Sequence, residues 1–247
     1  MPVSPTRTRR ALAVLIAGLV IFWAGMIYGV VFYRDHVFPY ALLERLFVDG
    51  RRPNIDPSAA PWYRARRSFF ETFPQRGRLL MLGDSLTEAA DWAIMLPSIA
   101  PVVNQGIPGD TTAGMLMRVD LANATNAQTV AVMAGINDLQ LGAPVEQVFK
   151  GYQQLIERLA APDRCIIVQS TLLTRGHEPI NDSVRALNAD LRKDCGEGRC
   201  KFLDLNPTLA PAGELLPELT VDGLHLTGRG YALWRDALLP ALAECAR

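Results

Sequence analysis

Hydrophobic and polar positions follow two alternating patterns from residue 79 onward. Short runs rich in apolar residues predict strands at Leu79–Leu82, Pro101–Asn104, Thr129–Ala134, Cys165–Gln169 and Lys201–Leu205, of which Leu79–Leu82 and Thr129–Ala134 are apolar enough to be buried. Between and after them, apolar residues recurring every three or four positions predict helices over Thr87–Leu96, Thr111–Asn123, Pro144–Ala161, Ile180–Lys193 and Gly228–Cys245. Strands that alternate with helices predict an α/β domain over residues 79–247, with a parallel sheet and helices on both of its faces.

A different pattern occupies the N-terminus, where residues 11–33 contain no charged side chain. A helix of 23 residues is long enough to cross the ~30 Å hydrocarbon core of a bilayer. Arg7, Arg9 and Arg10 precede this run and mixed charges follow it, which predicts a single-pass signal anchor with residues 1–10 in the cytoplasm. The domain over residues 79–247 would then be periplasmic or extracellular.

Two other interpretations of residues 11–33 remain open. A cleaved signal peptide has a shorter apolar region and a small-residue cleavage site, and no Ala-x-Ala follows this run. A buried core helix is expected to contain polar breaks. The uncleaved anchor therefore fits the segment best.

Residues 34–78 are expected to form a juxtamembrane segment and linker. Apolar residues at near-helical spacing within 34–50 fit a helix that lies either on the membrane or on the domain. Residues 51–78 are rich in Pro and Arg, and Trp62–Phe70 is expected to be helical and docked on the domain.

Composition narrows the classes of function. The chain has 247 residues, 49% of them hydrophobic, and its 25 basic and 25 acidic residues balance. This length predicts one folded domain plus an N-terminal extension, and a basic stripe that would bind nucleic acid is absent from the sequence. No His, Cys or Asp cluster has metal-ligand spacing and no phosphate-binding loop is present, so we expect neither a metal nor a cofactor.

Four cysteines permit two disulfides in three possible pairings. Cys195 and Cys200 flank a short, glycine-containing connection and are the expected first pair. Cys165 and Cys245 would form the remaining pair, which would tie a strand to the last helix.

Polar residues gather where the predicted strands end. Ser85 follows the first strand, Asn104–Asp110 the second and Gly135–Asp138 the third, while Asp222–His225 precedes the last helix. In open parallel sheets, functional side chains gather at the carboxyl ends of the strands. The pattern therefore predicts that these four blocks meet at one edge of the sheet.

Together the blocks resemble the SGNH (GDSL) hydrolase family, in particular the branch with the catalytic subunits of platelet-activating-factor acetylhydrolase and bacterial acyl-ester hydrolases. The matching positions are Ser85, Gly106, Asn137 and His225, with Asp222 three residues before the histidine. The resemblance implies a flavodoxin-like three-layer α/β/α sandwich. It also implies an oxyanion hole made of the Ser85 N–H, the Gly106 N–H and the Asn137 side-chain amide.

The residue types fit acyl transfer. A serine hydroxyl needs a neighbouring base, and His225 is the expected base because Asp222 is placed to orient its ring. Of the other two histidines, His36 precedes the domain, and His177 is expected at a pocket rim or on the surface. Asp84 and Asp138 are expected to brace loops through backbone hydrogen bonds rather than to take part in the chemistry.

The sequence thus predicts a membrane-anchored serine esterase that forms an acyl-enzyme on Ser85. Its substrate would be an O-acetylated glycan or small ester, or a lysophospholipid presented by the membrane. Two other functions remain open, namely an O-acyltransferase that uses a glycan acceptor and a catalytically silent binding module of the same fold.

Overall fold

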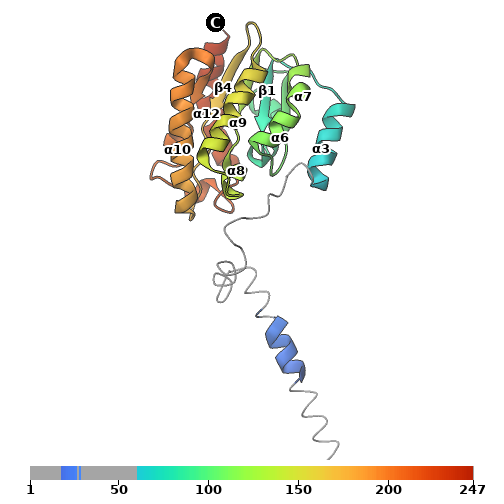
Figure 1. The fold of residues 1–247 in the computed structure, drawn as a ribbon, viewed down its shortest axis with the longest axis vertical. Helices are drawn as coiled ribbons and strands as arrows, with labels where there is room; N and C mark the ends of the chain where they lie inside the picture. Colours follow the sequence, from blue (N-terminus) through green and yellow to red (C-terminus); the bar gives the residue numbers. More distant parts are fainter. Residues whose placement is uncertain (1–17, 27, 29–59, 247) are drawn as a thin grey trace, which may run out of the picture. The chain divides into compact units, whose positions relative to one another are not determined.

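A computed structural model of the chain describes residues 18–26, 28 and 60–246 (Figure 1). The chain divides into two compact units, residues 1–53 and 54–247. In the first, residues 18–26 are helical, and their apolar side chains, such as Phe22 and Trp23, are exposed. The rest of the predicted anchor and the predicted helix within 34–50 lie outside the described residues. Within the described part of the chain, no helix has both the length and the apolar character needed to cross a bilayer.

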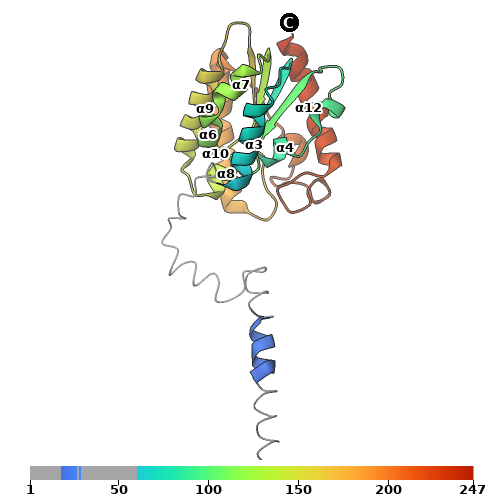
Figure 2. The same cartoon turned by 90° about the vertical axis from the view of Figure 1, so that its right-hand side faces the viewer.

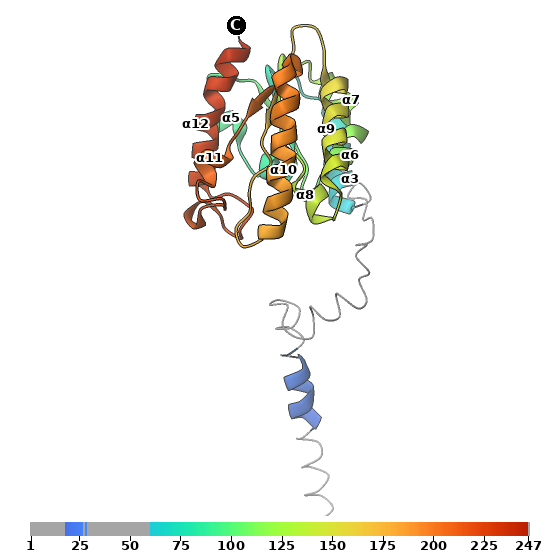
Figure 3. The same ribbon diagram turned by 60° about the vertical axis from the view of Figure 1, so that its left-hand side comes forward.

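The second unit is built on a five-stranded parallel sheet, as predicted. The strands are β1 (Leu79–Gly83), β2 (Val102–Gly106), β3 (Thr129–Val132), β4 (Cys165–Gln169) and β5 (Lys201–Leu203), in the order β2-β1-β3-β4-β5. This is the flavodoxin-like order, in which the chain changes direction beside β1. All five residues of β1 are buried because strands flank it and helices cover both faces (Figures 1 and 3).

Alternate residues of the strands point to opposite faces of the sheet and pack into two separate hydrophobic cores. On one face Leu80, Leu82 and Val130 pack with α9 (Val145–Leu159) and α10 (Glu178–Asp194). On the other face Met81 and Ile167 pack with Trp92 and Trp234, which come from α5 (Trp92–Met95) and α12 (Gly228–Cys245). The predicted three-layer sandwich is therefore present.

Two predicted helices are each broken in two. The segment predicted as one helix over Thr87–Leu96 forms α4 (Ser85–Glu88) and α5, because the Asp91 side chain accepts the Ile94 N–H (3.2 Å) and starts a new helix. Asn104 stabilises the backbone between these two helices, since its Nδ2 lies 3.1 Å from the carbonyl oxygens of Thr87, Glu88 and Ala90.

The segment predicted as Thr111–Asn123 forms α6 (Thr112–Met117) and α7 (Val119–Ala124). Arg118 lies between them with φ −124°, outside the helical region. Its guanidinium is fully buried and pairs with Asp110 at 2.7 Å. We attribute the break to this pair, because a buried arginine needs a partner that a continuous helix would not place there.

The predicted helix in the linker is α3 (Pro61–Thr72), and it docks on the domain as expected (Figure 2). Tyr63 and Phe70 are buried against Ile107, and the Tyr63 hydroxyl donates to the Gly114 carbonyl (2.7 Å). Short helices that the pattern did not predict complete the unit: α8 (Ile136–Gln140), η2 (Cys195–Arg199), α11 (Asn206–Leu209) and η3 (Pro217–Leu219).

Both disulfides of the expected pairing are present. Cys195–Cys200 closes the η2 turn, and Cys165–Cys245 joins the start of β4 to the end of α12.

Candidate active site

Ser85 is the first residue of α4, directly after the buried strand β1. The Asp84 side chain caps this helix by accepting the Leu86 N–H (2.9 Å), which holds the serine at the turn between strand and helix. The Ser85 N–H makes no hydrogen bond within residues 60–246. The turn thus presents a partly exposed hydroxyl next to a free backbone donor.

Asp222 and His225 come from one loop that Asp222 shapes. One carboxylate oxygen accepts the N–H groups of Leu224 (3.0 Å) and His225 (2.7 Å), and the other lies 2.6 Å from Nδ1 of the His225 ring. Burial acts to raise the pKa of Asp222, but these hydrogen bonds outweigh it and hold the pKa below its usual value. Asp222 is therefore a carboxylate at neutral pH.

The loop is braced on both sides. At its base Thr220 and Leu226 form an antiparallel bridge, and the Thr220 hydroxyl donates to the His225 carbonyl (2.9 Å). At its tip Gly223 has φ +92°, and its carbonyl accepts the Arg175 N–H (2.8 Å). A Cβ at position 223 would lie 2.8 Å from the Arg175 carbonyl oxygen, so the close approach requires glycine.

The two parts meet at the carboxyl edge of the sheet. His225 Nε2 lies 2.9 Å from Ser85 Oγ, across 140 residues of sequence. The side chains of His225 and Asp222 are 38% and 50% exposed, so an incoming molecule can reach them. Ser85, His225 and Asp222 therefore form a continuous hydroxyl–imidazole–carboxylate chain that can move a proton from the serine.

Asn137 is also brought to this site, whereas the structure argues against Gly106 as an oxyanion donor. Asn137 Nδ2 donates to the Asp110 carbonyl (2.9 Å) and lies 3.4 Å from Asp84 Oδ2. The Gly106 N–H is already donated to Asn104 Oδ1 (2.9 Å). A Cβ at position 106 would lie 2.3 Å from the Glu88 nitrogen, so this glycine serves the close packing of β2 against α4.

Gly109 is a second glycine in the loop after β2, and it was not among the oxyanion donors expected from the sequence. Its φ is +73°, and its N–H makes no hydrogen bond in the described part of the domain. The next residue, Asp110, donates its N–H to Ile107 and accepts from Asn137, which holds this turn beside the end of β1. The available signal was the Pro-Gly pair at 108–109, which is typical of a turn with positive φ.

Three buried carboxylates lie under this edge of the sheet. Burial raises the pKa of Asp84 to about 7, and the nearby charges of Asp110 and Asp138 add to this effect. Burial also raises the pKa of Asp110 to about 6, although Arg118 opposes it. Asp138 accepts the N–H and hydroxyl of Thr112, yet burial still raises its pKa. Asp84 and Asp138 therefore brace backbone groups, as expected.

Tyr231 supports the site in a way that the sequence pattern did not reveal. Its hydroxyl donates to the Leu86 carbonyl (2.8 Å), which ties α12 to the helix that carries Ser85. Its ring stacks on Trp234 and meets Trp92 edge-on. His177 is exposed at the start of α10 and contacts none of the three residues of the chain, while His36 lies outside the described residues. Within the described residues, no cluster of His, Cys, Asp and Glu could hold a metal ion.

Known proteins resemble this chain in sequence and in fold. The sequence model of the GDSL-like Lipase/Acylhydrolase family matches residues 81–233. Curated N-acylneuraminate cytidylyltransferases of Streptococcus agalactiae are 28% identical over 163 residues, or 66% of this chain. The match covers 38% of their length, so the chain spans about two fifths of these relatives.

Solved structures share the fold over nearly their whole length. A GDSL-like lipase from Bacteroides thetaiotaomicron has a TM-score of 0.62 at 21% identity and covers 74% of this chain and 97% of its own. A lipolytic G-D-S-L protein from Veillonella parvula has a TM-score of 0.58 at 25% identity, with 66% and 96% covered. An acetylxylan esterase from Geobacillus stearothermophilus has a TM-score of 0.55 at 20% identity, with 68% and 94% covered. The chain thus belongs to the GDSL-like lipase/acylhydrolase family and is a hydrolase of the SGNH type.

Proposed function

We propose that the protein is a serine esterase that hydrolyses a carboxylic ester through an acyl-enzyme on Ser85. The observation that carries this proposal is the 2.9 Å contact between Ser85 Oγ and His225 Nε2, with Asp222 at 2.6 Å from the other ring nitrogen. Asp222 is ionised, so it favours the tautomer with the proton on Nδ1 and leaves Nε2 free to accept the serine proton.

The reaction proceeds in two halves. Ser85 Oγ bonds to the ester carbonyl carbon as its proton moves to His225 Nε2, and the carbonyl oxygen becomes an oxyanion. The imidazolium then gives this proton to the alcohol oxygen, the carbon–oxygen bond breaks, and the acyl group stays on Ser85. A water molecule repeats both steps in the second half, which releases the carboxylic acid and restores the serine.

The oxyanion would be held by the free N–H groups of Ser85 and Gly109 and by the side-chain amide of Asn137. Gly109 takes the place that the resemblance gave to Gly106, because the N–H of Gly106 is already bound to Asn104. Loss of one such donor typically raises the activation barrier by ~3 kcal/mol.

The direct test uses the full chain with p-nitrophenyl acetate and a fluorophosphonate probe. We expect turnover and labelling of the wild type, and a loss of at least ~10⁴-fold in kcat for Ser85→Ala. Ser98→Ala, at an exposed serine in the turn after α5, is the matched control and should retain both signals. Labelling that persists in Ser85→Ala would refute the assignment of the nucleophile.

For the substrate, we propose an O-acetylated sugar or small ester before a lysophospholipid. The relatives at 28% identity are named N-acylneuraminate cytidylyltransferases, whose name refers to a sugar substrate, and this supports the first class. A panel of p-nitrophenyl esters from acetyl to palmitoyl separates the two. A kcat/KM that falls with chain length supports the sugar ester, and one that rises supports the lysophospholipid.

An O-acyltransferase would use the same residues, with a glycan hydroxyl in place of water in the second half. Mass analysis of the products with and without a glycan acceptor distinguishes it from the esterase. The assembled hydroxyl–imidazole–carboxylate chain disfavours a silent binding module, since binding alone requires no such contact.

We also propose that residues 11–33 anchor the protein in a membrane, with residues 1–10 in the cytoplasm and the catalytic domain outside it. The uncharged run and the preceding arginines support this orientation. The two disulfides support an oxidising compartment for the domain.

A further inference from the structure

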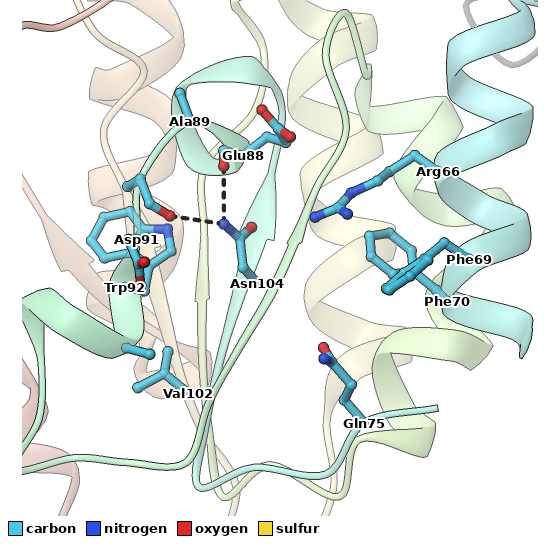
Figure 4. Close-up of a pocket in the computed structure, with 12 residues that line it drawn as sticks. Arg66, Phe69, Phe70, Gln75, Glu88, Ala89, Asp91, Trp92, Val102 and Asn104 are labelled. Carbon is cyan, nitrogen blue, oxygen red and sulfur yellow. Dashed lines mark hydrogen bonds between the residues drawn. The ribbon is translucent and has the colours of Figure 1, made fainter. Parts of the chain in front are cut away.

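A pocket of about 420 Å³ lies outside the Ser85, His225 and Asp222 set (Figure 4). It opens between α3, the α4–α5 segment and β2, and its volume is in the range that holds small molecules. The pocket is lined by charged, polar and aromatic side chains, among them Arg66, Phe69, Gln75, Glu88, Asp91 and Trp92.

Arg66 enters this pocket from α3 without a polar partner. Its guanidinium lies over the rings of Phe69 and Phe70, 5.6 and 5.0 Å from their centroids. Its Nε is buried without a hydrogen bond, and within residues 60–246 it forms no ion pair. The neighbouring Arg67 on the same helix differs in this respect, since it pairs with Glu71 at 3.0 Å.

An unpartnered, partly buried guanidinium indicates an anionic occupant. Leaving a buried donor unsatisfied is unfavourable, and the planar fork of arginine fits a carboxylate or phosphate with two parallel hydrogen bonds. The rings under Arg66 hold the fork in place and exclude water from one of its faces.

The other polar groups of the pocket would suit an occupant that carries hydroxyls beside its anionic group. Glu88 and Asp91 also face the pocket, and their charges would repel a bare phosphate or carboxylate (Figure 4). The Glu88 carboxylate makes no hydrogen bond or ion pair with the described residues. Carboxylates accept hydrogen bonds from hydroxyls, as the Gln75 amide can also do. The half-exposed ring of Phe69 offers an apolar face to a sugar ring.

The pocket is lined by a residue of the helix that carries the proposed nucleophile. Glu88 lies three residues after Ser85 on the single turn of α4, which is ~4.5 Å along the helix axis. Asn104 fixes the wall between the two sites, because its amide nitrogen holds three carbonyls at the end of α4 and its oxygen holds the Gly106 N–H. The pocket and the proposed nucleophile thus share the short helix α4.

We propose that this pocket binds the acidic, hydroxyl-rich part of the ester substrate, that is, a sugar that carries a carboxylate or phosphate. Arg66 binds the anionic group, and Glu88 with Gln75 binds hydroxyls. This assignment rests on the proposed esterase function and specifies the class of its substrate.

The first experiment measures binding without turnover. Full-length Ser85→Ala is titrated with D-glucuronate, glucose 6-phosphate, D-glucose and inorganic phosphate, and the fluorescence of the chain is followed because Trp92 lines the pocket. We expect both acidic sugars to bind at least tenfold more tightly than glucose or phosphate. Equal binding of all four, or no binding of either acidic sugar, would overturn the proposal. The two acidic sugars distinguish a carboxylate from a phosphate as the anionic group.

The second experiment compares two esters that differ only at the anionic group, O-acetylated glucuronate and O-acetylated glucose. We expect wild type to favour the glucuronate ester at least tenfold in kcat/KM. Arg66→Gln should bring this ratio close to one, chiefly through a higher KM for the glucuronate ester, and Arg66→Lys should retain part of the preference. Arg67→Gln, on the same helix, is the control and should keep the wild-type ratio.

The ratio separates recognition from folding, since a loss of folded protein lowers both activities equally. An unchanged ratio in Arg66→Gln would refute the role of Arg66. If neither ester nor the fluorophosphonate probe reacts while D-glucuronate still binds, the esterase assignment fails and the binding site stands.

Discussion

The Asp222 carboxylate has two roles within the loop of residues 222–225. One oxygen organises the loop by accepting two backbone N–H groups, and the other meets the imidazole. The first task holds the backbone of the loop in shape. The second determines which nitrogen of His225 faces Ser85.

Asp222→Asn separates the two tasks. The amide oxygen can still accept the N–H groups of Leu224 and His225, so the loop should keep its shape, but an amide NH₂ would then face Nδ1 and favour the wrong tautomer. We expect kcat for p-nitrophenyl acetate to fall by about 10³-fold, and up to ~10⁴-fold, with a nearly unchanged unfolding temperature. Asp163→Asn, in an exposed turn, should match wild type. Wild-type activity in Asp222→Asn would contradict the proposed role.

Asp84 should make stability depend on pH. Its pKa is raised to about 7 in the folded protein from 3.8, so the folded state holds an extra proton between these values. The resulting stabilisation is full below pH 3.8 and is lost as the pH rises through 7. Asn at this position resembles the neutral carboxyl. Between pH 5 and pH 8, the free energy of unfolding in urea should therefore fall by about 2–3 kcal/mol more in wild type than in Asp84→Asn.

The control for this prediction is Asp190→Asn, at an exposed residue of α10. It should follow the pH dependence of wild type. If the curves of wild type and Asp84→Asn stay parallel between pH 5 and pH 8, Asp84 does not retain its proton on folding.

A glycine in a loop can be required for its positive φ, for a close contact that a side chain would block, or for both. Gly223 is required for both reasons, since its φ is +92° and the Arg175 carbonyl fills the space beside it. Gly142 has φ +86° but open space around it. The two positions thus offer a matched pair in which only one supports the proposed catalytic loop.

Gly223→Ala should displace the loop that carries His225 and Asp222. We expect kcat to fall at least tenfold and the protein to lose ~1–2 kcal/mol of stability, because both the backbone conformation and the contact become strained. Gly142→Ala should lose about 1 kcal/mol and keep its kcat. Equal kcat values for the two variants would show that the Arg175 contact does not position the loop.

The sequence predicted the type of each long element but not where buried polar groups interrupt it. Periodicity placed the five strands and the helices α9, α10 and α12 to within a few residues, because burial alone dictates those patterns. It missed the breaks at Asp91 and Arg118, since both depend on side-chain partners. The family resemblance pointed to Gly106 rather than Gly109, and the choice between these two glycines depends on the partner of one N–H group.

For the whole molecule, strand order explains why distant blocks could be expected to converge. β1 lies between β2 and β3, so Ser85, the Gly109 turn and Asn137 leave neighbouring strands at the same edge. Strand order alone does not place the fourth block, Asp222–His225, at the edge where it was expected, because this loop precedes a helix rather than following a strand. Its placement depends on the Arg175 and Tyr231 contacts, which join segments far apart in the sequence.

The proposed topology has a test that uses the cysteines, which are four in the whole chain. If the domain is outside the cytoplasm of a bacterial host, all four should be oxidised in intact spheroplasts and should react with impermeant PEG-maleimide only after an impermeant reductant is added. The expected gel shift corresponds to four labels for wild type and two for the Cys195→Ala/Cys200→Ala variant, since each disulfide contributes one pair. If the domain lies in the reducing cytoplasm, the reagent should attach no label to intact spheroplasts, with or without the reductant. After lysis it should attach four labels without any reductant. A membrane pellet that releases the chain on carbonate washing would argue separately against the anchor at residues 11–33.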